Sequence, residues 1–211
     1  MKLAVVGAAG RTGRLVVDLA LAAGHTVTAV ARTPSRLPDF EHGTPLTAQA
    51  DVQRPGSLHA PLAGQDAVVS TLGTTGRAAT TVFSDGAREL VAAARAGGVR
   101  HVVAMSSAGL DSDHLPLAQR VVTRLVVDRL YREVHRDLAR MEAVLTDSDT
   151  IWTVVRVPML KDGPASTAPW VSYGLPLPKA GTATRATVAT WIVGHLGAAE
   201  TFRHLVSIAD G

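Results

Sequence analysis

Short apolar runs alternate with helical apolar periods along the whole chain. Continuous or β-branched runs predict strands at residues 3–6, 26–31, 45–50, 66–71, 100–105, 151–156 and 202–208, the third of them weakly. Apolar residues repeating at three and four predict helices directly after residue 13, in short form from 55, and at 81–96, 125–145 and 186–196. Strand and helix therefore follow each other in regular alternation.

This alternation predicts the α/β class, with a Rossmann-type, doubly wound parallel sheet and helices on both of its faces. A chain of 211 residues has the length of a single domain, 1–211, and no linker divides it. Ligands of such a sheet bind at the carboxyl ends of its strands.

A segment near the C-terminus breaks the pattern. Residues 157–185, rich in Pro and Gly up to residue 179, are expected to form a loop that covers the substrate. Within it, Trp170 and Tyr173 could stack on a flat substrate, although packing inside the protein is the more frequent use of such side chains.

Composition narrows the function classes. Cysteine is absent, which excludes disulfides and thiolate chemistry and is compatible with a cytoplasmic protein. No apolar run approaches about 18 residues and no signal-peptide pattern precedes the first strand, so we expect neither a membrane span nor secretion. The formal charge of +3 is dispersed and aromatic residues are only 4%, so a nucleic-acid partner is not expected.

Two further chemistries find no support in the residue spacing. The eight histidines are scattered, with no i, i+4 pair, so no metal site is expected. No Gly-x-Ser-x-Gly segment surrounds Ser106 or Ser107, which argues against a hydrolase.

Three glycines follow the first strand at a spacing of three, Gly7, Gly10 and Gly13. A strand, a glycine turn and a helix form the setting in which a loop cradles phosphates. The first glycine then permits the tight turn, the second lets a pyrophosphate approach the main chain, and the third brings the helix close to the strand. The helix N-terminus faces the phosphates. An ordinary strand-to-helix turn is the alternative, but this setting favours dinucleotide binding.

Two arginines stand where such a fold selects its cofactor. The end of the second strand meets the adenosine ribose, and an acidic residue there suits NAD, whereas an arginine suits the 2′-phosphate of NADP. This chain has Arg32 at that position and Arg36 one helical turn later. A guanidinium group fits a phosphate well, so the pair favours NADP over two merely solvated surface arginines.

Small polar groups follow two further strands. Asp51 comes just after the third strand, where its carboxylate could accept the amino group of adenine or could cap a turn. Ser106 and Ser107 end the fifth strand. Their hydroxyls could donate hydrogen bonds to a nicotinamide amide or to a substrate carbonyl, or could simply form a compact turn.

Taken together, these motifs resemble the NAD(P)H-binding, NmrA-like branch of the atypical short-chain dehydrogenases/reductases, and most of all its biliverdin-IXβ/flavin reductase type. The resemblance covers nearly the whole chain. It is carried by segments 7–13 (GAAGRTG), 31–32, 50–52, 66–73 (DAVVSTLG), 98–107 (GVRHVVAMSS) and 152–158 (WTVVRVP). It is specific for the fold and the cofactor, and it says little about the substrate.

The resemblance implies a role for each matched residue. The pyrophosphate would be held by Gly7, Ala9, Gly10, Arg11, Thr12 and Gly13, and the 2′-phosphate by Arg32 and Arg36. The adenine would be lined by Asp51 and Val52, the ribose side by Leu72 and Gly73, and the nicotinamide by Ser107 with Ser106. Met159 stands where the biliverdin-IXβ type carries a histidine, a departure that disfavours tetrapyrrole reduction.

The wider family carries a catalytic Tyr-x-x-x-Lys pair on the helix after the fifth strand. This chain has Tyr131 and His135 with that spacing. By the resemblance, Tyr131 would protonate the substrate oxygen. His135 cannot supply the permanent charge of a lysine. Because Tyr131 lies near the apolar side of its predicted helix, packing is the alternative role.

We therefore expect an NADPH-dependent oxidoreductase, a monomer or homodimer, that transfers a hydride to a small acceptor such as a flavin, a quinone or a carbonyl. A flavin or quinone can take its proton from water, so the missing lysine is compatible with these acceptors. The alternative is a non-enzymatic, NmrA-like sensor that binds NADP(H) and acts through a protein partner. Such a sensor requires that NADP⁺ and NADPH differ in their effect on partner binding.

Overall fold

An eight-stranded sheet forms the centre of the computed structural model, which describes residues 1–74, 76, 78–111, 128–177 and 181–211. The strand order is β3-β2-β1-β4-β5-β6-β10-β8. The strands are β1 (Lys2–Val6), β2 (Thr26–Ala31), β3 (Leu46–Gln49), β4 (Ala67–Ser70), β5 (His101–Ser107), β6 (Trp152–Val157), β8 (Trp170–Tyr173) and β10 (His204–Ala209). All pairs are parallel except that of β8 with β10. Since the strand order reverses between β1 and β4, a ligand crevice is expected at their carboxyl ends.

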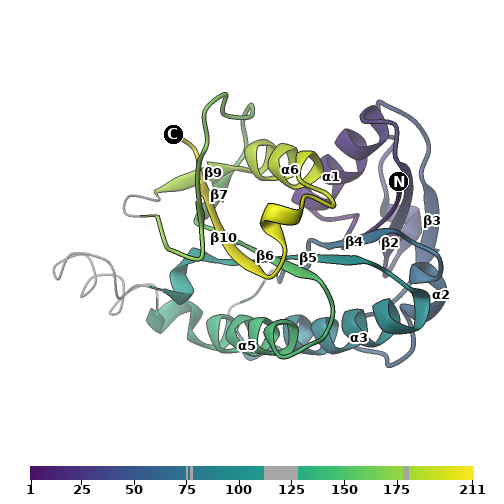
Figure 1. Ribbon diagram of the computed structural model, residues 1–211, viewed down its shortest axis with the longest axis horizontal. Helices are drawn as coiled ribbons and strands as arrows, with labels where there is room; N and C mark the ends of the chain where they lie inside the picture. The colour runs from purple at the N-terminus through teal and green to yellow at the C-terminus, as the bar shows by residue number, and fades with distance from the viewer. Residues whose placement is uncertain (75, 77, 112–127, 178–180) are drawn as a thin grey trace, which may run out of the picture.

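Helices cover both faces of this sheet (Figure 1). One face carries α1 (Arg11–Ala22) and α6 (Arg185–Gly194), and the other carries α2 (His59–Leu62), α3 (Val82–Gly97) and α5 (Asp128–Thr146). Short 3₁₀ turns follow at η1 (Pro34–Arg36), η2 (Ala108–Leu110) and η4 (Ala199–Thr201). The doubly wound Rossmann-type fold expected from the sequence is thus confirmed.

The hydrophobic core lies in two layers, one on each face of the sheet. Leu90, Leu138 and Trp152 belong to the layer under α3 and α5. Val16 and Ile192 belong to the layer under α1 and α6. The central strands are buried on both faces, which explains why they read as continuous apolar runs instead of alternating ones.

Residues 157–185, predicted to be a loop that covers the substrate, are not one loop, and their covering role stays a prediction. This stretch contains β7 (Met159–Lys161), β8 and β9 (Thr182–Thr184), and β7 pairs with β9 in a small parallel sheet. The edge strand β8 exists because it pairs with β10, more than thirty residues later in the chain, and no local pattern announces such a partner. Residues 178–180, and the predicted beginning of the long helix at 125–127, lie outside the described residues.

Trp170 and Tyr173 are both on this edge strand, and neither is a core residue. Trp170 is 46% exposed and Tyr173 is 40% exposed. Strand β8 is three strand spacings from β5, or roughly 14 Å. Trp170 pairs with Ala209 at the carboxyl edge, whereas Tyr173 pairs with Val206 further back and contacts His204 edge to face. The two rings therefore do not converge on one stacking site.

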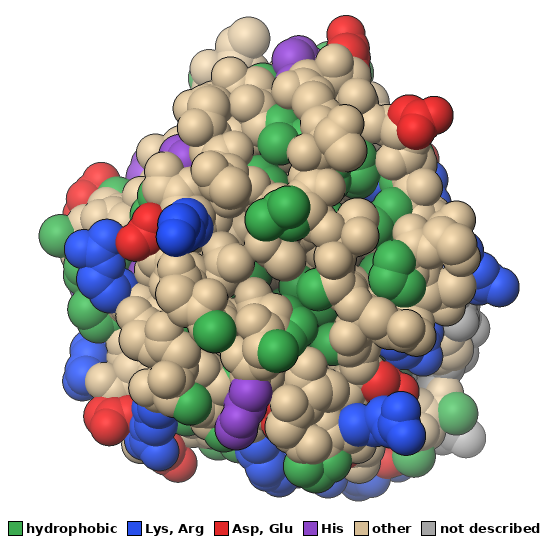
Figure 2. All heavy atoms as spheres, turned by 90° about the vertical axis from the view of Figure 1, so that its right-hand side faces the viewer, with side chains coloured by type: hydrophobic (Ala, Val, Ile, Leu, Met, Phe, Trp, Pro, Cys, Tyr) green, Lys and Arg blue, Asp and Glu red, His purple; other side chains and the backbone are tan. Residues whose placement is uncertain are grey.

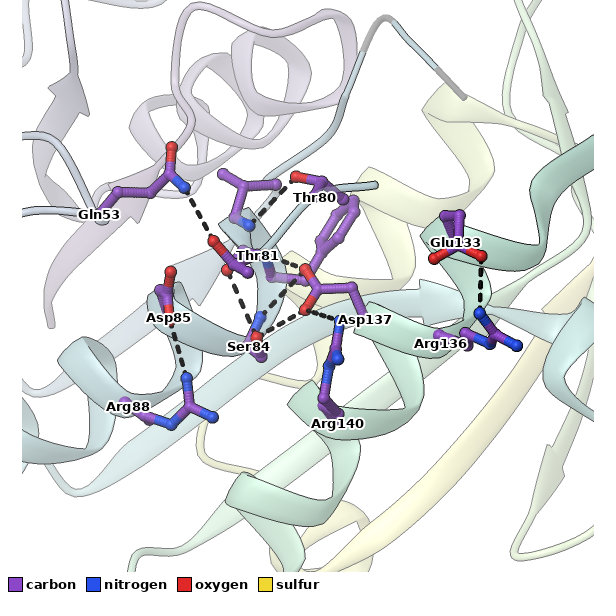
Figure 3. Close-up of polar contacts among 12 residues, drawn as sticks. Gln53, Thr80, Thr81, Ser84, Asp85, Arg88, Glu133, Arg136, Asp137 and Arg140 are labelled. Carbon is purple, nitrogen blue, oxygen red and sulfur yellow. Dashed lines mark hydrogen bonds and ion pairs between the residues drawn. The ribbon is translucent and has the colours of Figure 1, made fainter. Parts of the chain in front are cut away.

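The buried carboxylate of Asp137 joins helices α3 and α5 (Figure 3). Asp137 of α5 is fully buried and accepts hydrogen bonds from the backbone N–H of Phe83 at 2.9 Å and the hydroxyl of Ser84 at 2.5 Å. It therefore caps the N-terminus of α3, whose N-cap residue Thr81 makes no side-chain cap of its own. The apolar repeat that predicts this helix does not distinguish Asp137 from the polar residues near it in the sequence, Arg136 and Arg140 among them.

Positive and negative side chains are mixed on the side of the molecule where β1 begins. Figure 2 views the protein from the side on which β1 begins, and side chains of both signs are spread around the rim of this face with apolar ones between them. This agrees with the dispersed charge of the sequence. Among the helices that the structure describes, none has the length and apolar character needed to cross a membrane.

A buried histidine makes stability depend on pH. His101 is 2% exposed and contacts the hydroxyl of Thr153 at 2.8 Å, and burial lowers its pKa from 6.5 to about 4. Because the unfolded chain takes up this proton at higher pH than the folded protein, the free energy of unfolding should fall as pH drops, by about 2 kcal/mol between pH 7 and 5. Urea unfolding at both pH values measures it. His101→Gln should flatten this slope, whereas the exposed control His59→Gln should leave it; equal slopes in both variants would contradict the assignment.

Candidate functional site

The glycine turn after β1 is built on close backbone contacts. Gly7 has φ +85°, a left-handed conformation that favours glycine, and the N–H groups of Gly7 and Ala8 both donate to Val30 O. A Cβ on Gly13 would stand 2.3 Å from Gly7 O and 2.7 Å from Thr71 Oγ1. The helix can approach the strand only because position 13 has no side chain, as the glycine spacing predicted.

Substitution at this contact should be costly. Gly13→Ala forces a methyl group against the carbonyl of Gly7, and overpacking of this kind costs about 1–3 kcal/mol. We expect a lower unfolding midpoint and a weaker NADPH affinity in fluorescence titration. The control Gly194→Ala, where a Cβ would meet nothing within 4 Å, should leave both unchanged. A Gly13→Ala protein with parental stability and affinity would contradict the close approach.

The N-terminus of α1 is open to an anion. Its N-cap residue is Gly10, which has no side chain to cap the first turn and whose N–H donates to Gly7 O at 2.9 Å. Arg14 Nε holds Ala9 O at 3.0 Å and so fixes the turn, while Thr12 is buried. A phosphate would complete the hydrogen bonding of such a helix end.

Both arginines predicted for the 2′-phosphate lie at the carboxyl end of β2. Arg32 directly follows the strand and Arg36 ends η1, and both are exposed. The carbonyl of Arg32 accepts a hydrogen bond from Gln49 Nε2 at 3.1 Å, which ties this backbone to β3. The structure thus places two cations beside the strand that borders β1.

Two of the residues predicted to line the adenine and the ribose, Val52 and Leu72, pack against α3. A Cβ on Gly86 would stand 2.6 Å from Leu72 and 3.5 Å from Val52, so this glycine lets both side chains lie against the helix. Asp51 Oδ1 accepts from the backbone of Gln53 at 3.1 Å, which is the turn-capping arrangement. Gly73 lies exposed beyond β4.

Ser106 and Ser107 point to different partners at the carboxyl end of β5. The buried Ser106 donates its hydroxyl to Glu142 Oε1 at 2.6 Å. Glu142 also accepts from Arg156 Nε at 3.0 Å and Nη2 at 2.7 Å. These hydrogen bonds raise the pKa of Arg156 above its ordinary value. The hydroxyl of Ser106 is therefore part of a buried ionic network.

Ser107 instead faces the first turns of α5. Its Oγ accepts a hydrogen bond from Gly109 N at 3.1 Å and lies 3.4 Å from His135 Nε2. Tyr131 stacks on His135 with ring centroids 6.2 Å apart and is 37% exposed, so it is not a packing residue of the core. The structure thus brings together Ser107, Tyr131 and His135, and separates Ser106 from them.

The phosphate turn is joined to the segment after β7. Arg11 forms an ion pair with Asp162, and Arg185 Nη1, at the start of α6, contacts the same carboxylate at 2.8 Å. No local pattern predicts this contact, because the three residues come from separate parts of the chain. Thr71, Glu142 and Asp162 were not predicted as residues of the site for the same reason.

One cluster among the described residues has the composition of a metal site. Ligand atoms of Asp18, Glu41 and His42 lie within 4.8 Å of one another at the surface. His42 donates its backbone N–H to Asp18 at 3.1 Å, and its Nδ1 lies 3.0 Å from the same carboxylate. The pairing of His42 with Asp18 accounts for this cluster without a metal ion. The cluster does not lie at the carboxyl edge of the sheet.

The comparison with protein families agrees with the interpretation of the glycine turn as a dinucleotide-binding loop. A family model described as NAD(P)H-binding matches residues 7–198. The chain belongs to this NAD(P)H-binding family. The cradle at Gly7 and Gly13, which a Cβ would fill, is what a member needs to hold a dinucleotide pyrophosphate.

Solved structures share the fold. The oxidoreductase YlbE of Lactococcus lactis matches with a TM-score of 0.82 at 18% identity, covering 100% of this chain and 91% of that one. A short-chain dehydrogenase/reductase of Veillonella parvula in complex with NADP matches with a TM-score of 0.77 at 22% identity (99% and 94%). The anaerobillin reductase ChuY of Escherichia coli O157:H7 matches with a TM-score of 0.77 at 18% identity (100% and 97%). At these identities the likeness concerns the fold.

Proposed function

We propose that this NAD(P)H-binding protein is an NADPH-dependent oxidoreductase that delivers a hydride to a small acceptor. The observation that carries the proposal is the common position of three features at one edge of the sheet. These are the glycine cradle with the open N-terminus of α1, the pair Arg32 and Arg36, and the hydroxyl of Ser107. A nicotinamide cofactor supplies the hydride, and the protein supplies binding and orientation.

The preference for NADPH rests on charge at the end of β2. Both arginines there are exposed, and a guanidinium group matches a phosphate through two parallel hydrogen bonds. A 2′-hydroxyl would call for an acceptor instead, and Asp39 and Glu41 come later in the chain.

The roles at the nicotinamide end follow from the hydrogen bonds. We assign contact with the reacting groups to Ser107, because Ser106 gives its hydroxyl to Glu142, and we place Tyr131 next to them through its stacking on His135. Arg11 would exchange its partner Asp162 for the pyrophosphate, which carries more charge.

The first experiment follows NADPH oxidation by the purified protein with FMN, quinones and small carbonyl compounds. Saturable turnover with one acceptor class would support the oxidoreductase. Tight NADPH binding in the same preparation without turnover of any acceptor would reject it.

The second candidate, a redox sensor that acts through a protein partner, is favoured by the exposed apolar side chains of the C-terminal segment. Met159 is 73% exposed and Leu175 is 69% exposed, in addition to Trp170. A sensor would bind NADP⁺ and NADPH with different consequences for this surface, which hydrogen exchange of residues 159–175 in the two complexes would measure.

A further inference from the structure

The hydroxyl of Ser107 has two nitrogen atoms as neighbours, one of the backbone and one of an imidazole. Gly109 N donates to Oγ at 3.1 Å, and His135 Nε2 lies 3.4 Å from the same oxygen. A serine hydroxyl has two acceptor positions and one proton. When the backbone and the imidazole fill both acceptor positions, the proton of Ser107 remains to be donated to a third group.

The position of the His135 ring next to Ser107 depends on the glycine at position 109. A Cβ on Gly109 would stand 2.8 Å from His135 Cε1 and 3.2 Å from Nε2, so a side chain at this position would displace the ring from its place beside Ser107. The ring also stacks with Tyr131, one helical turn earlier on α5. The imidazole is therefore in contact with both η2 and Tyr131, and its Nε2 lies beside Ser107.

We propose that His135 is a positioning and proton-supplying residue for Ser107, and that the acceptor is consequently an aldehyde or ketone. This rests on the oxidoreductase function proposed above. The hydride, with its electron pair, adds to the carbonyl carbon, and the electrons of the C=O π bond move to the oxygen. That oxygen takes the proton of Ser107, and Ser107 Oγ takes the Nε2 proton of the His135 imidazolium. The neutral imidazole then recovers a proton from water, so a reduced nicotinamide, a carbonyl and one proton yield an oxidised nicotinamide and an alcohol.

If His135 supplies the proton through Ser107, the pair should matter for the reduction of carbonyl compounds and much less for that of quinones. A carbonyl reduced by hydride becomes an alkoxide, which is strongly basic and gains from a proton donor in the transition state. A quinone becomes a hydroquinone anion, whose charge is delocalised over the ring and which takes its protons from water. Loss of the Ser107–His135 pair should therefore affect the first class far more than the second.

The test uses 4-nitrobenzaldehyde and 2,3-butanedione as carbonyl probes and menadione as the quinone probe, all with NADPH. His135→Gln keeps an N–H donor for Ser107 but cannot release a proton. We expect the ratio of aldehyde to menadione turnover to fall about 100-fold in this variant, through kcat more than KM. Addition of imidazole to His135→Ala should restore part of the aldehyde turnover. The exposed control His204→Gln should keep the parental ratio.

A second measurement needs no cofactor and no turnover. In ¹⁵N-histidine spectra of the free protein near pH 7, Nε2 of His135, assigned from its loss in His135→Gln, should carry a proton. Its signal should shift in Ser107→Ala and in Gly109→Ala, but not in Gly194→Ala. A bare Nε2, or a His135→Gln protein with the parental acceptor ratio, would overturn the role of His135.

The outcomes separate this inference from the function on which it rests. A parent protein that reduces menadione but neither carbonyl probe would overturn the carbonyl assignment and leave the oxidoreductase standing. A parent protein that binds NADPH and reduces no acceptor at all would overturn both.

Discussion

Replacing Arg32 by alanine should weaken NADPH binding roughly 10- to 150-fold while NADH binding changes little. The side chain is exposed at the end of β2, where the 2′-phosphate that distinguishes NADPH from NADH would lie. A lost hydrogen bond to a charged group costs about 1.5–3 kcal/mol, which corresponds to this range of affinity. Fluorescence titration with each cofactor measures the two dissociation constants.

The matched control is Arg95→Ala, which removes an exposed arginine of α3 whose partner is Asp149. It should alter neither affinity. Arg36→Ala should act in the same direction as Arg32→Ala and more weakly, because Arg36 ends the turn η1 and lies further from the end of β2. Equal weakening of NADPH and NADH by Arg32→Ala would reject the 2′-phosphate role.

Replacing Glu142 by alanine should lower the free energy of unfolding by about 3–5 kcal/mol. Glu142 is 7% exposed and holds both Arg156 and Ser106. Removing one partner of a buried ion pair leaves much of the other charge uncompensated, because the remaining carboxylate, Asp111, lies further away, at 3.7 Å from Arg156 Nη1. This is more costly than the net contribution of the intact pair. Urea unfolding at neutral pH measures the change.

The control for this prediction lies on the same helix. Glu133→Ala breaks an exposed i, i+3 pair with Arg136 and should change stability by no more than about 0.5 kcal/mol. The double variant Glu142→Leu with Arg156→Met should recover much of the loss, because it removes both charges. A Glu142→Ala protein as stable as Glu133→Ala would contradict the prediction, because it would show that water or another side chain stabilises the charge of Arg156.

The helix α5 shows how far a sequence pattern reaches. Its apolar stripe, with Val134, Leu138 and Met141, was evident, and these residues are buried as predicted. Asp137 and Glu142 stand about 60° and about 80° from Val134 around the helix, at the two borders of that stripe. Residues at a border are buried or solvated according to what the neighbouring elements offer, and here α3 offers unpaired N–H groups and β6 offers Arg156.

The sequence by itself determined the order of strands and helices, the parallel sheet and the glycine turn, because these follow from apolar periodicity and from local backbone geometry. It also placed Arg32 and Ser107 at strand ends, since parallel strands end at one edge.

Only the tertiary structure decided which polar groups meet there. It paired β8 with β10, gave the hydroxyl of Ser106 to Glu142, and set His135 against Ser107. Such contacts join residues from distant parts of the chain, and their geometry depends on how helices pack across the sheet. No local pattern of residues contains that information.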